Sequence, residues 1–174
     1  MKKMILCAIL CAGQLYGMRN NLPERQGETL MDLLAKTNNL KSFNVLMNKL
    51  AERFPGSTRE DIAKKLNTPL ANKYIEINKA FVQSILTEDP VARLQYAQTY
   101  LKRDADPNFT FRYGDNSYGS VLGTAYNMAV KDHGEGNRLV ELLLNEYKAN
   151  PNVKHTDTTL IKFSQEMTKQ HETR

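Results

Sequence analysis

Apolar residues recur every three or four positions along most of the chain from Gly27 onward, which is the spacing of amphipathic helices. The first two helical segments meet at a pair of asparagines, which favours a tight turn and predicts a short helix hairpin. A Pro-Gly pair at positions 55 and 56 ends the second segment. The apolar positions of the two segments are Leu30, Leu33 and Leu34, and then Leu40, Phe43, Leu46, Met47, Leu50 and Phe54.

The same spacing predicts six further helices. Ser57 and Glu60 match a capping box, which predicts the start of the third helix. A longer helix follows "NTPL" and ends at Asp89-Pro90, since the residue before a proline is disfavoured in a helix. The remaining helices are predicted over 91–102, 121–130, 138–149 and 160–167. Alternating apolar and polar runs, which are typical of strands, are absent, so no strand is predicted.

A short motif occurs twice. Ala105-Asp106-Pro107-Asn108 matches Ala149-Asn150-Pro151-Asn152, which lies 44 positions later, and each copy follows an apolar helical segment. Proline prevents the preceding helix from continuing. Helix-pair repeats commonly have periods of about 33 to 47 residues, and one pair cannot bury its apolar stripe without a neighbour. The motif therefore predicts stacked helix pairs, and the alternative is an unrelated helical bundle with a chance duplication.

The residues around the motif resemble ankyrin repeats. "RLVELLLNEYKANPN" is similar to the second helix of that family and the turn after it, and "SVLGTAYNMA" is similar to its first helix. The resemblance is clearest over 92–165 and weaker over 27–50, and over 53–90 only Thr68-Pro69-Leu70 matches. It implies an all-α fold: a short ankyrin-like solenoid of stacked helix-turn-helix units with long connecting loops, about four units in all.

The chain departs from the family pattern at several points. Asp104 and Lys148 stand where the family usually has glycine in a left-handed conformation, which implies a cost of about 1 kcal/mol each. The family's histidine after Thr-Pro-Leu is missing. Segments 112–120 and 131–137 have the character of insertions, and 53–90 is atypical and suggests inserted helices.

The N-terminal segment "MKKMILCAILCAGQLYGM" has the order of charged, apolar and small residues that is typical of a signal peptide. We expect a signal peptide over 1–17, cleaved after Gly17 or else Gly13, and a repeat domain over 18–174. The apolar run is about half the ~20 residues of a spanning helix. Two alternatives are a buried N-terminal helix and a lipoprotein acylated at Cys11 or Cys7.

Composition and charge narrow the possible partners. The chain has 174 residues, of which 41% are hydrophobic and 25% charged, which suits one globular domain. Removing the signal peptide takes Lys2 and Lys3 with it, so the net charge falls from +5 to +3. The remaining basic residues are scattered among acids, so we expect no nucleic-acid partner. Cys7 and Cys11 are the only cysteines, so the mature chain would have no disulfide.

Candidate chemistry is sparse. The three histidines, His133, His155 and His171, lack a partner at the i+4 spacing of a zinc helix, and no nucleophile motif is present. We therefore expect no catalytic residue, no metal and no cofactor. The aromatic loop "NFTFRYGDNSY" has two interpretations: one or two of its rings cover the core, or the loop contacts a partner protein. The hypothetical partner-binding residues are Arg112, Tyr113, Asn116 and Tyr118.

These observations favour an exported protein, periplasmic or secreted, that is monomeric and binds another protein without being an enzyme. A signal peptide combined with ankyrin-like repeats suits a bacterial protein directed toward a host, which is an argument by analogy. The alternative is a small helical enzyme or a ligand-binding protein with a pocket formed around 53–90.

Overall fold

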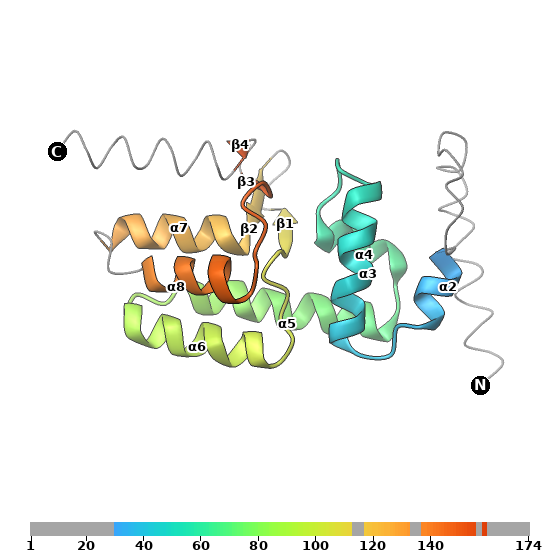
Figure 1. The fold of residues 1–174 in the computed structure, drawn as a ribbon, viewed down its shortest axis with the longest axis horizontal. Coiled ribbons are helices and arrows are strands. Elements are labelled where there is room, and N and C mark those ends of the chain that lie inside the picture. The colour runs from blue at the N-terminus through green and yellow to red at the C-terminus, as the bar shows by residue number, and fades with distance from the viewer. Residues whose placement is uncertain (1–29, 113–116, 133–136, 156–157, 160–174) are drawn as a thin grey trace.

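A computed structural model describes residues 30–112, 117–132, 137–155 and 158–159, and the fold is mostly helical, as predicted (Figure 1). Every helix predicted within these ranges is present. The expected signal peptide over 1–17, with Cys7 and Cys11, and the last predicted helix over 160–167 lie outside the described residues. The helices are α2 (Leu30–Ala35), α3 (Leu40–Arg53), α4 (Arg59–Leu66), α5 (Pro69–Ile85), α6 (Pro90–Lys102), α7 (Val121–Lys131) and α8 (Asn137–Glu141), which continues as the π-helix η2 (Leu142–Glu146).

The prediction that no strand would form was wrong. Strands β1 (Thr110–Arg112) and β2 (Tyr118–Ser120) pair in an antiparallel hairpin, and β3 (Lys154–His155) pairs with β4 (Thr158–Thr159) in the same way. Strands of two or three residues are too short to show alternation in a sequence. In the first hairpin Gly119 lies opposite Phe111, and a Cβ atom at Gly119 would come within 2.4 Å of that ring. The close approach explains why a glycine stands there.

Side-chain caps set where the helices begin. The capping box of α4 is formed by Thr58 and Asp61, one residue after the predicted pair Ser57 and Glu60. The Thr58 hydroxyl accepts from the Asp61 amide at 3.0 Å. Such a box satisfies amide groups that have no partner in the first turn of a helix. The prediction had the right motif one residue too early, because Ser57 and Thr58 are both good capping residues.

Four helices form two pairs that lie side by side. Helix α5 packs on α6 and α7 packs on α8; across the pairs, α5 contacts α7 and α6 contacts α8. Figure 1 shows these four helices running roughly parallel. Helix α3 lies beside this group, on the right of the view, at a steep angle to it. Helix α4 contacts α3, α5 and β1, so it joins the two regions. The segment 53–90 thus contributes α5 to a helix pair and α4 to the junction.

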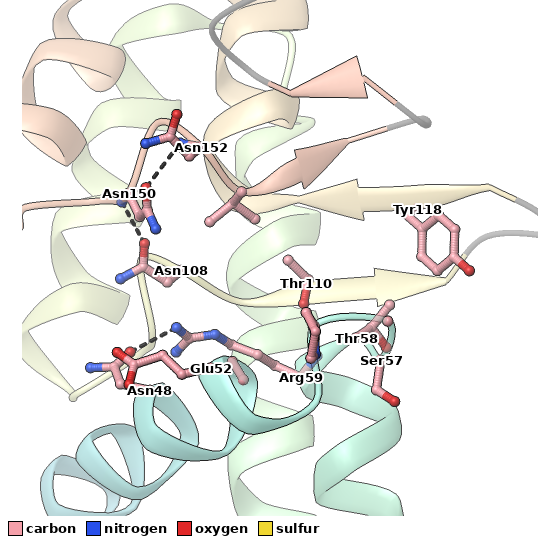
Figure 2. A pocket seen from close by; sticks show the side chains of 14 residues that line it. Asn48, Glu52, Ser57, Thr58, Arg59, Asn108, Thr110, Tyr118, Asn150 and Asn152 are labelled. Carbon is pink, nitrogen blue, oxygen red and sulfur yellow. Dashed lines mark hydrogen bonds between the residues drawn. The ribbon is translucent and has the colours of Figure 1, made fainter. Parts of the chain in front are cut away.

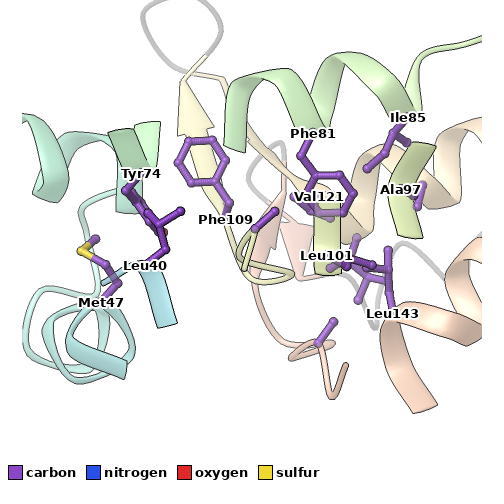
Figure 3. Close-up of a cluster of buried hydrophobic side chains, with 14 of the residues drawn as sticks. Leu40, Met47, Tyr74, Phe81, Ile85, Ala97, Leu101, Phe109, Val121 and Leu143 are labelled. Atoms are coloured by element: carbon purple, nitrogen blue, oxygen red, sulfur yellow. The ribbon is translucent and has the colours of Figure 1, made fainter. Parts of the chain in front are cut away.

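One apolar core runs through both regions (Figure 3). The Tyr74 ring lies 5.0 Å from the Phe43 ring and 5.7 Å from the Phe109 ring, measured between centroids, so aromatic contacts connect α3, α5 and the segment before β1. Phe109 is fully buried. The interpretation that a ring of the aromatic loop covers the core is therefore confirmed for Phe109.

The two copies of the repeated motif adopt equivalent turns. Asp104 and Lys148 both have a left-handed backbone, with φ of 62° and 52°, as predicted. The Asp106 carboxylate then accepts from the Asn108 amide at 2.8 Å, and the Asn150 side chain accepts from the Asn152 amide at 2.9 Å. A short hairpin follows each turn. The second helix differs by ending in the π-helix η2, where the Tyr147 amide donates to the Leu142 carbonyl at 3.2 Å.

Glycine at either left-handed position should stabilise the fold. Asp104→Gly and Lys148→Gly are each expected to raise the free energy of unfolding by about 1 kcal/mol, because glycine has no Cβ to oppose a positive φ. Urea denaturation followed by circular dichroism measures the change. Gln95→Gly, at an exposed position inside α6, is the control and should lower stability by about 1 kcal/mol. A loss of stability in both left-handed variants would contradict this explanation.

Among the described helices, none is long and apolar enough to cross a membrane.

Candidate functional site

An open cleft of about 570 Å³ lies between the C-terminal end of α3, the start of α4 and the two repeated turns (Figure 2). Most of the residues that line it are polar. Four asparagines contribute, one from α3 and three from the turns, together with the carboxylate of Glu52, the start of α4 and the ring of Tyr118. The asparagines are Asn48, Asn108, Asn150 and Asn152.

A buried ion pair supports the cleft. Arg59 Nη1 donates to Asp106 Oδ2 at 2.7 Å, and the side chains are only 9% and 2% exposed. Tyr74 Oη donates to the same carboxylate oxygen at 2.6 Å. A buried charge is tolerated only when it is paired and hydrogen-bonded, and here both conditions are met. The ion pair therefore joins α4 and α5 to the first turn.

Arg59 and Tyr74 keep their usual protonation states in this buried cluster. Burial alone would lower the pKa of the Arg59 guanidinium, but the Asp106 carboxylate outweighs it and the pKa is raised. Burial and the charge of Asp106 together hold the pKa of the Tyr74 hydroxyl well above its usual value. Tyr74 therefore stays protonated and can donate to Asp106.

Further hydrogen bonds fix the segment from the first turn to β1. The Asp106 amide donates to Asn78 Oδ1 at 2.7 Å, and the Arg59 amide donates to Thr110 Oγ1 at 2.8 Å. Both bonds connect residues far apart in the sequence, which resists movement of the turn relative to α4 and α5. The wall of the cleft is thus held by the scaffold rather than by the loop alone.

The structure places two of the four predicted partner-binding residues together. Arg112 and Tyr118 are opposite one another in the hairpin, with the guanidinium carbon 5.0 Å from the centre of the ring. Tyr118 lines the cleft, whereas Arg112 Nε donates to Asp61 Oδ2 at 2.8 Å. Arg112 therefore anchors the hairpin to α4. Tyr113 and Asn116 lie outside the described residues.

The same contact affects Asp61. Burial would raise the pKa of its carboxyl group, but hydrogen bonds from Arg112 and Thr58 and the charge of Arg112 outweigh burial, so the pKa is lowered. Asp61 therefore remains ionised at neutral pH and serves both as the cap of α4 and as the partner of Arg112.

Sequence reasoning missed the residues that build the cleft. Asp106 was noticed only as one letter of the repeated motif, and its partner Arg59 lies 47 positions earlier. Arginine and aspartate at such a separation form no local pattern. The repeated asparagines were the one available signal, because Asn108 and Asn152 occupy matching places in the two motifs.

The polar groups around the cleft suit binding by hydrogen bonds. They are side-chain amides, hydroxyls, the Glu52 carboxylate and the Arg59 guanidinium, whose charge is paired with Asp106. The Thr58 hydroxyl is already engaged, because it accepts from the Asp61 amide as the N-cap of α4. Within the described ranges, no group of three His, Cys, Asp or Glu side chains could hold a metal ion.

No protein-family model matches the chain, and neither a curated protein nor a solved structure matches it.

Proposed function

We propose that the chain is an exported, non-enzymatic protein-binding module built as a short ankyrin-type solenoid. One observation carries the proposal: the pairs α5–α6 and α7–α8 end in equivalent left-handed turns and hairpins that contact each other. The Asn150 amide donates to Asn108 Oδ1 at 2.6 Å, so the second turn rests directly on the first. This is the neighbour relation that stacked repeats require.

Stacking places the connecting segments on one side of the molecule. Strand β2 of the first hairpin contacts β3 of the second, and the cleft opens beside the turns that precede them. In repeat proteins such edges form extended binding surfaces, whereas the helices behind them provide a rigid scaffold. The resemblance to ankyrin repeats implies the same use of this edge.

Tyr118 is the proposed anchor of the surface. Tyrosine and arginine are enriched among residues that dominate binding energy at protein interfaces. The ring of Tyr118 is partly exposed at the cleft, and Arg112 lies over one of its faces, so the ring is held in place before a partner arrives. A side chain ordered in advance loses less entropy on binding.

Tyr118→Ala is expected to weaken capture of a partner protein by about thirtyfold, which corresponds to about 2 kcal/mol for a dominant interface residue. The melting temperature should change little, because the ring is not part of the buried core. Affinity capture from candidate cell extracts with quantitative mass spectrometry measures the binding of the partner. Thermal denaturation measures the melting temperature.

Tyr96→Ala is the matched control, since Tyr96 is 51% exposed on α6 and does not line the cleft. It should leave capture unchanged. If Tyr118→Ala lowers the melting temperature in proportion to the loss of capture, the ring serves the fold and the assignment of Tyr118 fails.

The second candidate is a ligand-binding protein. It is favoured by the cleft itself, because residues 55–59 of the atypical segment line it. Its volume lies within the range of about 300–1,000 Å³ that is usual for small-molecule sites. Native mass spectrometry distinguishes the two: a tightly held small molecule together with no captured protein would favour this candidate.

A further inference from the structure

Three asparagines present unused hydrogen-bond donors at the cleft. The side-chain oxygen of Asn48 accepts from Arg59 Nη2 at 2.7 Å, that of Asn108 from the Asn150 amide at 2.6 Å, and that of Asn150 from the Asn152 amide at 2.9 Å. Each partner can only donate, so the oxygen of each amide is identified by chemistry. Within the described part of the chain, the three Nδ2 groups have no acceptor. A ligand that fits them must supply acceptors.

The charge of the cleft selects among such ligands. The charge of Arg59 is balanced by Asp106, so it attracts no further anion strongly. Glu52 is exposed at the cleft and makes no ion pair among the described residues. It stands in the last turn of α3, where the helix dipole disfavours an acid. The carboxylate thus suits a cation and opposes phosphates and acidic segments.

The shape of the cleft suits an extended ligand. Figure 2 shows the lining residues running from Tyr118 along β1 to the asparagines of the two turns. An extended polypeptide has carbonyl oxygens at regular intervals of about 3.3 Å per residue and can carry a lysine or arginine side chain. A neutral oligosaccharide has acceptors but no cation for Glu52.

We propose that the cleft binds an extended polypeptide segment containing a basic residue. Its main-chain carbonyl oxygens accept from the side-chain amides of Asn48, Asn108 and Asn150, and its lysine or arginine pairs with Glu52. The inference rests on the proposed protein-binding function and specifies the kind of segment that is recognised.

Selection from a library of random 12-residue peptides displayed on phage, with the full chain as bait, tests the proposal. The enriched peptides should share a lysine or arginine at one position. Synthetic versions should bind Glu52→Gln about three- to tenfold more weakly than the original chain. With Glu52→Lys as bait, the selected position should change from basic to acidic.

Two variants separate binding from stability. Asn48→Asp keeps an oxygen that accepts from Arg59 but replaces the amino group with an anionic oxygen, which repels the carbonyl oxygen of a bound peptide, so it should weaken peptide binding without lowering the melting temperature. Glu146→Lys makes the same charge change as Glu52→Lys at the end of another helix, away from the cleft, and should leave peptide binding unchanged.

Three results would overturn the inference: no enriched peptide, enriched peptides that bind Glu52→Lys as well as the original chain, or binding of neutral oligosaccharides on a glycan array instead. If no peptide binds while Tyr118→Ala still weakens capture of a folded partner, the protein-binding function stands and only the proposed recognition of an extended segment is wrong. If neither capture nor selection yields a binder, both proposals fall.

Discussion

Asp106→Ala is expected to lower the free energy of unfolding by about 3–5 kcal/mol, the largest effect of any single change considered for this chain. The carboxylate is 2% exposed and accepts from Arg59 and Tyr74, while its other oxygen accepts from the Asn108 amide. Removing it leaves the Arg59 charge buried without its partner. Urea denaturation followed by circular dichroism measures the loss.

A double variant tests this explanation. Arg59→Met combined with Asp106→Leu removes both charges, so it should recover part of the stability lost in Asp106→Ala. Glu141→Ala, at an exposed position on α8, is the control and should change stability by less than about 0.5 kcal/mol. A loss below about 1 kcal/mol in Asp106→Ala would show that the ion pair does not hold the turn.

Arg93→Met is expected to have the second largest effect, a loss of about 3 kcal/mol. The Arg93 side chain is 1% exposed and pairs with Asp132 at the end of α7. Its Nε and Nη2 atoms also donate to the Thr87 carbonyl oxygen, at 2.9 and 2.6 Å, and Nη2 donates to that of Glu88. Methionine has a similar length but no donor, so the carbonyl groups would lose their partners.

Thermal and urea denaturation of Arg93→Met should show the loss. Hydrogen exchange should show its location, because the loop before α6 and the end of α7 should exchange faster than in the original chain. Arg138→Met is the matched control at an exposed position of α8 and should have almost no effect on stability. An equal loss in both variants would contradict a special role for Arg93.

Arg59 and Arg93 both hold together segments that are distant in the sequence. Arg59 joins the α3–α4 region to the first turn, and Arg93 joins the loop before α6 to the end of α7. Each satisfies groups from segments that are distant in the sequence. A guanidinium is suited to this because it offers five donors in a planar arrangement and stays charged when buried.

Local patterns predicted the helices and much of the core. The spacing of Leu40, Phe43 and Leu46 placed one face of α3 inside, and all three are buried. Met47 and Leu50 are buried as expected too, whereas Phe54, at the end of the apolar stripe, is only partly buried. These predictions succeed because a helix repeats every 3.6 residues and its apolar face is visible in a single stretch of sequence.

The candidate site was predicted only in part. Tyr118 was chosen because aromatic residues on loops often contact partners, and it does line the cleft. Arg112 was predicted because arginine often anchors protein interfaces, but its contact with Asp61 is what positions the hairpin. That contact depends on how α4 packs against β1. Nothing in the sequence of either element indicates that the two elements will be in contact.

The sequence by itself determined the helical segments, the capping box of α4 to within one residue and the two left-handed turns, since each depends on residues within a few positions of one another. The tertiary structure alone decided which buried charges meet and where asparagines converge on a cleft. Arg59 and Asp106, or Asn48 and Asn150, become neighbours only when the helices pack, because contacts between distant segments arise from the burial of apolar faces rather than from any local pattern.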